Sequence, residues 1–121
     1  MPDGREWQAA LEHLAEARRL AEETGDRYYQ AETLRLTGDV LLASGDPAAA
    51  AASYHEAIAI AQQQRAKLWE LCAAMSLARL WRGQGKRPQA GDLLAPVHGW
   101  FTEGFGTPVL QEAKALLAEL A

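Results

Sequence analysis

The stretch at residues 34–57, LRLTGDVLLASGDPAAAAASYHEA, recurs forty residues later at 74–97 as AMSLARLWRGQGKRPQAGDLLAPV. Small, bulky and glycine positions coincide in the two copies. A fixed period of this length is typical of solenoids of stacked helices, whose units bury their apolar faces only against each other. The sequence therefore predicts a helical array that offers a binding surface and no reaction centre. The matched pairs are Gly38 with Ala78, Leu41 with Trp81, Gly45 with Gly85, Ala50 with Ala90, Tyr54 with Leu94, and Ala57 with Val97.

The composition indicates one globular domain. The chain has 121 residues, of which 49% are hydrophobic and 23% are charged, and its many alanines favour closely packed helices. No apolar run approaches the roughly 18 residues that a membrane span requires. The net charge is −4, with lysine and arginine scattered along the chain, so no concentrated basic face is available to phosphates. We therefore expect neither a membrane nor a nucleic acid as a partner.

Residue types that support catalysis or metal binding are not grouped. His13, His55 and His98 share neither a helix nor a ligand spacing, so we expect no metal site. The run Gly83 to Lys86 lacks the preceding strand and the spacing of a phosphate-binding loop. The single cysteine, Cys72, cannot form an internal disulfide, and no signal peptide precedes it, which indicates a reducing compartment. We expect a cytoplasmic protein that is no enzyme and uses no cofactor.

Apolar residues at helical spacing, interrupted by turn residues, predict about six helices in one all-α domain over residues 1–121. Asp46 and Pro47 begin the third helix, because aspartate accepts free amide protons and proline suits the first helical position. Gly25 suits a left-handed end of the first helix. The expected units are residues 6–24, 28–64, 67–103 and 107–121.

The first expected helix, 6–24, corresponds to the second half of a repeat whose first half is missing. Subtracting forty from the key positions of the third helix gives Ala10, Leu14 and Ala17. We therefore interpret the chain as the carboxyl-terminal piece of a longer array. An amino-terminal cap with a polar exposed face is the alternative, and Trp7 and Leu11 fit that alternative less well.

The repeat resembles the tetratricopeptide repeat (TPR). The resemblance implies a right-handed α-α superhelix, a TPR-like solenoid whose last helix, 107–121, caps the array. Thr37 departs from the family's usual leucine, Gln62 and Thr102 stand where it has proline, and the period exceeds the common 34 residues. HEAT-type helix pairs, which also have periods near forty, are the alternative fold. The residues that carry the resemblance are Leu34, Gly38, Leu41, Gly45, Ala50, Tyr54 and Ala57, then Ala74, Leu77, Ala78, Trp81, Gly85, Ala90, Leu94 and Val97.

Two further segments, Gln64 to Leu71 and Leu93 to Phe105, resemble the end of a group of large bacterial signalling proteins. In that group a class III adenylate/guanylate cyclase or a DNA-binding domain precedes a STAND-type ATPase module and terminal TPR-like repeats. The resemblance covers roughly residues 28–120. It implies where the chain belongs, since any nucleotide chemistry would lie in segments that this chain lacks.

The resemblance also implies a groove lined by the first helix of each unit. Arg79 and Arg82 are one helical turn apart, and two guanidinium groups at that spacing can hold a carboxylate of a peptide. Met75 beside them would form an adaptable apolar floor. The alternative is that both arginines are solvated or paired with Glu32, Asp39 or Glu70. The groove positions are Glu32, Arg35, Asp39 and Leu42 in one unit and Cys72, Met75, Arg79 and Arg82 in the next.

These features favour an interaction or scaffold module that binds a protein or peptide segment, or other domains of its parent chain. A small-molecule-sensing repeat domain of a STAND-type regulator is one alternative. A homodimer is another, because an unpartnered first helix would expose Trp7, Leu11 and Leu14.

Trp100, Phe101 and Phe105 form an aromatic cluster in the sequence. Aromatic side chains bury large areas, so we expect the cluster to be buried and to lock the terminal helix over the last repeat. A hydrophobic patch for a partner domain is the alternative.

Overall fold

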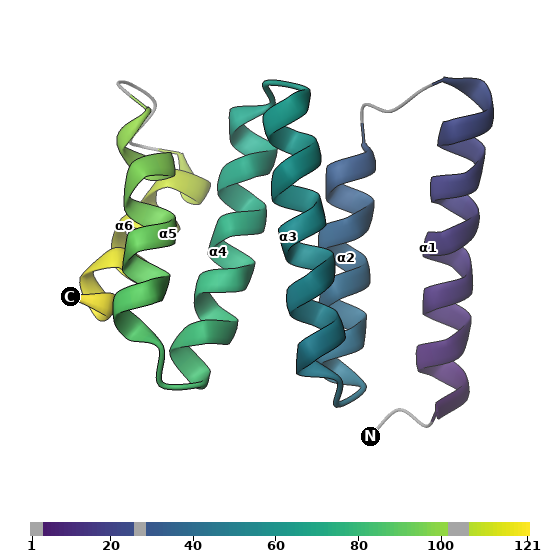
Figure 1. Cartoon of the computed structure of the whole chain (residues 1–121), viewed down its shortest axis with the longest axis horizontal. Coiled ribbons are helices and arrows are strands. Elements are labelled where there is room, and N and C mark those ends of the chain that lie inside the picture. Colours follow the sequence, from purple (N-terminus) through teal and green to yellow (C-terminus); the bar gives the residue numbers. More distant parts are fainter. Residues whose placement is uncertain (1–3, 26–28, 102–106) are drawn as a thin grey trace.

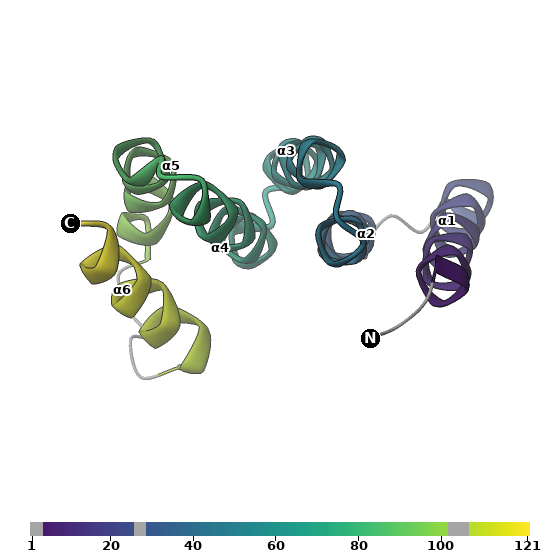
Figure 2. The same cartoon turned by 90° about the horizontal axis from the view of Figure 1, so that it is seen from below.

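The computed structural model describes residues 4–25, 29–101 and 107–121. These residues form six α-helices and no strand, so the predicted all-α solenoid of about six helices is confirmed. Successive helices from α1 to α5 lie side by side with alternating direction (Figure 1). Seen end-on, α2 and α4 lie on one side of the row and α3 and α5 on the other (Figure 2). The helices are α1 (Gly4–Thr24), α2 (Gln30–Ala43), α3 (Pro47–Gln63), α4 (Lys67–Gly83), α5 (Arg87–Gly99) and α6 (Pro108–Leu120).

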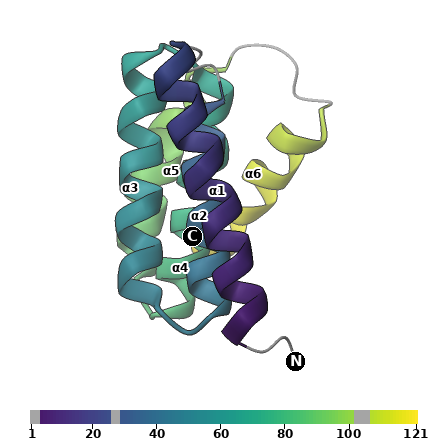
Figure 3. The same ribbon diagram turned by 90° about the vertical axis from the view of Figure 1, so that its right-hand side faces the viewer.

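The last helix departs from the direction of the others. Figure 3 shows α6 inclined to the roughly parallel axes of α1 to α5. It packs against both α5 and α4, and its buried face consists of Leu110, Ala113, Leu116 and Leu120. The end of the expected unit 67–103 and the start of 28–64 fall partly outside the described residues, as does Phe105.

The turns between helices repeat at half the period of the sequence. A residue with a left-handed backbone stands every twenty positions, at Gly25 (φ 76°), Gly45 (φ 95°), Arg65 (φ 55°) and Gly85 (φ 78°). Arginine adopts this conformation at a cost of about 1 kcal/mol, which glycine avoids. The predicted helix start at Asp46 is also present, because its carboxylate accepts a hydrogen bond from the Ala49 amide at 3.1 Å.

Helices α2 and α3 approach each other closely where they cross. Gly38 of α2 is buried against the ring of Tyr54 of α3, and a Cβ atom at residue 38 would lie 2.5 Å from Tyr54 Cε1. The equivalent positions of the next pair, α4 and α5, carry Ala78 and Leu94, both fully buried. A larger residue on the second helix is thus matched by a smaller one on the first.

Replacing Gly38 with alanine should destabilise the protein by about 1–3 kcal/mol, because the added methyl group overpacks the crossing against an aromatic ring that has no room to move. Urea denaturation measures this change in the free energy of unfolding. Gly83→Ala is the matched control, since a Cβ there meets nothing within 4 Å. Equal effects of the two substitutions would contradict the proposed close approach.

The aromatic residues at the end of α5 correct one expectation. Trp100 is 57% exposed, so the prediction that it is buried is wrong, whereas Phe101 packs against the core. Trp100 is the C-cap residue of α5 and Phe101 follows the end of the helix, so a helical spacing drawn through both residues does not determine which of them is buried. The rings of Trp100 and Phe101 pack edge to face, with their centroids 5.3 Å apart. The Lys67 ammonium lies 5.5 Å from the centroid of the Trp100 ring.

Because its ring lies at the surface, Trp100→Ala should lower the free energy of unfolding by about 1 kcal/mol or less, well below the roughly 3–5 kcal/mol typical of buried aromatic residues. Chemical denaturation of the variant gives this number. A loss of about 3 kcal/mol would instead place the ring in the core.

The first helix packs less closely than the others. Trp7, Leu11 and Leu14 are each half-buried rather than fully exposed, and both leucines face a hollow of about 360 Å³ between α1, α2 and α3. Arg18 crosses this hollow to reach Glu56 of α3, with 2.6 Å between nitrogen and oxygen. The exposed face of α1 is mainly polar, with ion pairs from Arg19 to acidic residues one turn before and after it.

Candidate functional site

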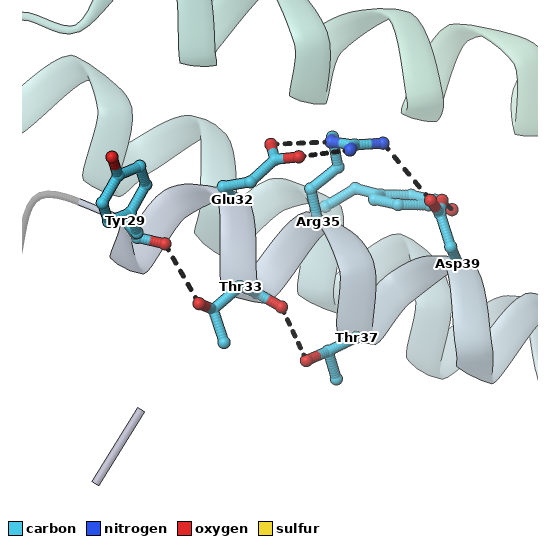
Figure 4. Close-up of polar contacts among 7 residues, drawn as sticks. Tyr29, Glu32, Thr33, Arg35, Thr37 and Asp39 are labelled. Atoms are coloured by element: carbon cyan, nitrogen blue, oxygen red, sulfur yellow. Dashed lines mark hydrogen bonds and ion pairs between the residues drawn. The ribbon is translucent and has the colours of Figure 1, made fainter. Parts of the chain in front are cut away.

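The groove residues of α2 form a network of charged side chains. Arg35 donates two hydrogen bonds to the carboxylate of Glu32 and lies 3.3 Å from Asp39, on one side of the helix (Figure 4). The hydroxyl of Tyr54, which comes from α3, donates to Asp39 at 2.5 Å. The network therefore ties the groove side of α2 to the buried crossing beneath it.

Thr37, which stands where the family usually has leucine, forms a hydrogen bond within its own helix. Its hydroxyl donates to the carbonyl of Thr33 at 2.8 Å, and Thr33 in turn donates to the carbonyl of Tyr29 at 3.1 Å (Figure 4). These threonines lie away from the side of α2 that carries Arg35. A polar side chain is tolerated there because the helix backbone satisfies it.

Two residues of this network, Tyr54 and Arg35, have pKa values raised by their surroundings. Burial, together with the hydrogen bond to Asp39, raises the pKa of the Tyr54 phenol well above its ordinary value. The hydrogen bonds to Glu32 raise the pKa of the Arg35 guanidinium. Arg35 is thus a permanent positive charge held between two carboxylates, and Tyr54 stays a neutral hydrogen-bond donor.

The two arginines of α4 have partners that the sequence analysis did not name. Arg79 lies 3.6 Å from Glu112, and Arg82 donates a hydrogen bond to Glu119, both on α6. Glu32 and Asp39 pair with Arg35, and Glu70 pairs with Lys67, so in the described part of the chain none of the three suggested acids is the partner of Arg79 or Arg82. All four side chains of the α4–α6 pairs are at least one-third exposed, so each pair contributes little to stability.

The structure brings half of the expected groove residues to one cavity. This cavity has a volume of about 170 Å³ and lies between α2, α4 and α6. Glu32, Asp39 and Leu42 do not line it, and Arg82 lines a neighbouring hollow of about 280 Å³. Met75 is only 3% exposed, so it forms the floor of the cavity. The lining residues are Arg35, Cys72, Met75, Ser76, Arg79, Val109 and Glu112.

Cys72 at this cavity is not an activated thiol. It is half-buried, and burial followed by the charge of Glu32 raises its pKa above the ordinary value. A raised pKa lowers the thiolate fraction at neutral pH and with it the reactivity of the thiol.

In the part of the chain that the structure describes, no three His, Cys, Asp or Glu side chains come together as a metal-binding group. The arrangement suits recognition of another polypeptide by charge and shape.

A comparison with protein-family models gives one match, the tetratricopeptide repeat, over residues 3–63. This match covers half of the chain. The chain belongs to the TPR family. Comparisons with curated proteins and with solved structures gave no match. TPR units generally mediate protein–protein interaction or scaffolding and are typically non-catalytic. Over residues 4–25, 29–101 and 107–121 no helix is long and apolar enough to cross a membrane.

The TPR register would have found the α6 residues that the sequence analysis missed. Adding forty to Cys72 and Arg79 gives Glu112 and Glu119, so the acids of α6 occupy the groove positions of a third first-type helix. The sequence analysis treated α6 only as a capping helix and considered its apolar face alone. The period itself was the signal that places these carboxylates beside the groove.

Tyr54→Phe should lower the free energy of unfolding by about 1.5 kcal/mol at neutral pH, because the buried phenol loses its hydrogen bond to a carboxylate. The difference from the wild type should narrow as the pH rises above about 10, where tyrosine ionises in the unfolded chain but remains protonated in the fold. Urea denaturation at a series of pH values measures both effects. A difference that stays constant through the alkaline range would contradict the raised pKa.

Proposed function

We propose that this TPR protein is a non-catalytic interaction module that binds a protein or peptide segment across the face formed by α2, α4 and α6. The single observation that carries the proposal is the set of charged and apolar side chains from all three helices around one open cavity. Arg35 and Arg79 supply positive charge, Glu112 supplies negative charge, and Met75 and Val109 supply an apolar floor. Mixed surfaces of this kind give a polypeptide both orientation and contact area.

Arg79 and Arg82 can still bind a carboxylate of a partner, although each already pairs with a carboxylate of α6. The pair between Arg79 and Glu112 is 3.6 Å long and exposed, so a carboxylate of a partner can replace Glu112 at small cost. Arg82 donates a hydrogen bond to Glu119, whereas Arg79 and Glu112 are beyond hydrogen-bond distance of each other. We infer that Arg79 is the first guanidinium that an incoming carboxylate meets.

Two other functions from the sequence analysis receive less support. Small-molecule sites commonly have volumes of about 300–1,000 Å³, so the groove cavity itself, at about 170 Å³, offers little room for a metabolite. A homodimer through Trp7, Leu11 and Leu14 would need these side chains at the surface, and they are half-buried. An interaction with another polypeptide therefore remains the preferred function.

We infer a bacterial signalling protein as the parent of this module. The support is the resemblance of Gln64 to Leu71 and of Leu93 to Phe105 to the terminal repeats of cyclase- or STAND-containing regulators. The last four of these residues lie outside the described part of the chain. In such a parent, the groove would bind either a separate protein or a neighbouring domain of the same polypeptide.

The proposal predicts that a photo-reactive amino acid at Glu112, an exposed residue that lines the groove cavity, cross-links a partner from lysate of the source cells. The same group at Ala52, an exposed position of α3 outside the groove, should not. The partner, identified by mass spectrometry and purified, is then titrated with Arg79→Gln/Arg82→Gln. We expect affinity to fall by about fivefold or more, and Arg87→Gln outside the groove to leave it unchanged. Equal cross-linking at both positions, or unchanged affinity, would contradict the proposed groove.

A further inference from the structure

Helices α1 and α6 lie at the two ends of the row (Figure 2) but differ in how much they bury. α6 has 13 residues, of which Leu110, Ala113, Leu116 and Leu120 are buried. α1 has 21 residues, and none of residues 6–24 is buried. An end position by itself therefore does not account for the weak packing of α1.

The seam between α1, α2 and α3 is more polar than its equivalent in the next repeat, which lies between α3, α4 and α5. Three positions of that second seam carry large aliphatic side chains that are buried or pack against the core, so apolar contacts hold its helices together. At the first seam the same three positions carry polar side chains. The equivalent positions, forty residues apart, are Arg18 and Ile58, Thr37 and Leu77, and Ser53 and Leu93.

The polar seam is also incompletely filled. A hollow of about 360 Å³ lies between α1, α2 and α3, and Thr37 and Ser53 line it together with Leu11, Leu14 and Leu34. The two hydroxyl side chains are shorter than leucine, and atoms that border a hollow lack packing partners on that side. The apolar area that α1 buries is therefore small, and so is the hydrophobic free energy that holds it in place.

An ion pair crosses this hollow. The Arg18 guanidinium lies 2.6 Å from Glu56 of α3 and 3.5 Å from Glu22 of its own helix. All three side chains are more than one-third exposed, so the attraction between α1 and α3 is modest and is screened by salt. Arg19 differs from Arg18, because both of its carboxylate partners belong to α1.

The other helices keep their own contacts without α1. α2 packs against both α3 and α4, and its Gly38 lies on the ring of Tyr54. The groove cavity is lined by α2, α4 and α6. Movement of α1 therefore leaves the groove unchanged, whether or not the groove binds a polypeptide.

We propose that α1 is a switch helix, which moves off α2 and α3 as one unit while the remaining helices stay folded. The pair between Arg18 and Glu56 biases α1 toward the docked state, and salt shifts the population toward the open state. In the docked state Leu11 and Leu14 are half-buried and Leu34 is 3% exposed. Opening brings these three side chains to solvent, so the apolar surface of the chain changes with ionic strength.

Amide hydrogen exchange, followed by nuclear magnetic resonance, measures the opening of each helix. We expect the amides of Leu11, Leu14 and Arg18 to share one protection factor, because the helix opens as a unit. This value should lie about 100-fold or more below that of Leu71 and Leu77 in α4, which are 0% exposed and exchange only when the core unfolds.

The variant Thr37→Leu/Ser53→Leu copies the side chains of the second seam. It should raise the protection of α1 by about tenfold or more, because aliphatic side chains fill the hollow. Arg18→Gln should lower the protection of α1 by about two- to fivefold at low salt and should remove most of its salt dependence. Arg19→Gln is the matched control and should keep the salt dependence.

Four results would overturn the proposal. Equal protection of α1 and α4 would mean that the chain opens as a single cooperative unit, and protection that rises gradually along α1 would mean that the helix frays from its end. Unchanged protection of α1 in Thr37→Leu/Ser53→Leu would contradict the part assigned to the polar seam. The same salt dependence in both arginine variants would contradict the part assigned to the ion pair.

Discussion

The close approach of paired helices is the constraint on which the rest of the array depends. Gly38 allows α2 to lie directly on Tyr54, and the hydroxyl of that same ring then reaches Asp39 on the groove side. The packing of the core and the position of a charged groove residue are therefore fixed by one side chain. In the next pair, Ala78 and Leu94 keep the approach but provide no hydroxyl. At these equivalent positions the first pair, and not the second, thus connects its core to the groove by a hydrogen bond.

The charged side chains of the groove already form ion pairs with one another. Arg35 lies between two carboxylates of its own helix, and Arg79 and Arg82 meet carboxylates of α6. In the proposed function, the carboxylates of an acidic partner would therefore displace existing carboxylates rather than meet bare cations, which favours specificity and reversibility over tight binding. Because the α6 acids are exposed, the free-energy cost of this exchange is small. The buried leucines of α6 hold the helix against the array independently of these exposed ion pairs.

The sequence predicted most of the fold because the repeat determines it locally. The period of forty, the start at Asp46 and the glycine turns each specify an element without reference to distant residues. The site was predicted less well. Pairing of Arg79 and Arg82 with α6 depends on how the last helix inclines, and the exposure of Trp100 depends on which side of α5 it occupies near the helix end. Neither property follows from composition or spacing considered one helix at a time.

The dependence of burial on neighbouring helices also explains why equivalent alanines differ in exposure. A residue in a solenoid is buried by the helices beside it, so Ala17 and Ala57 can share a residue type and a register and still differ in exposure. A pattern read within one helix predicts which face is apolar, but whether that face is covered is a property of the stack. The hollow of about 300 Å³ between α1 and α2, to whose lining Ala17 belongs, is where this distinction becomes visible. Its apolar lining is explained by the repeat, and its exposure by the absence of a covering helix among the described residues.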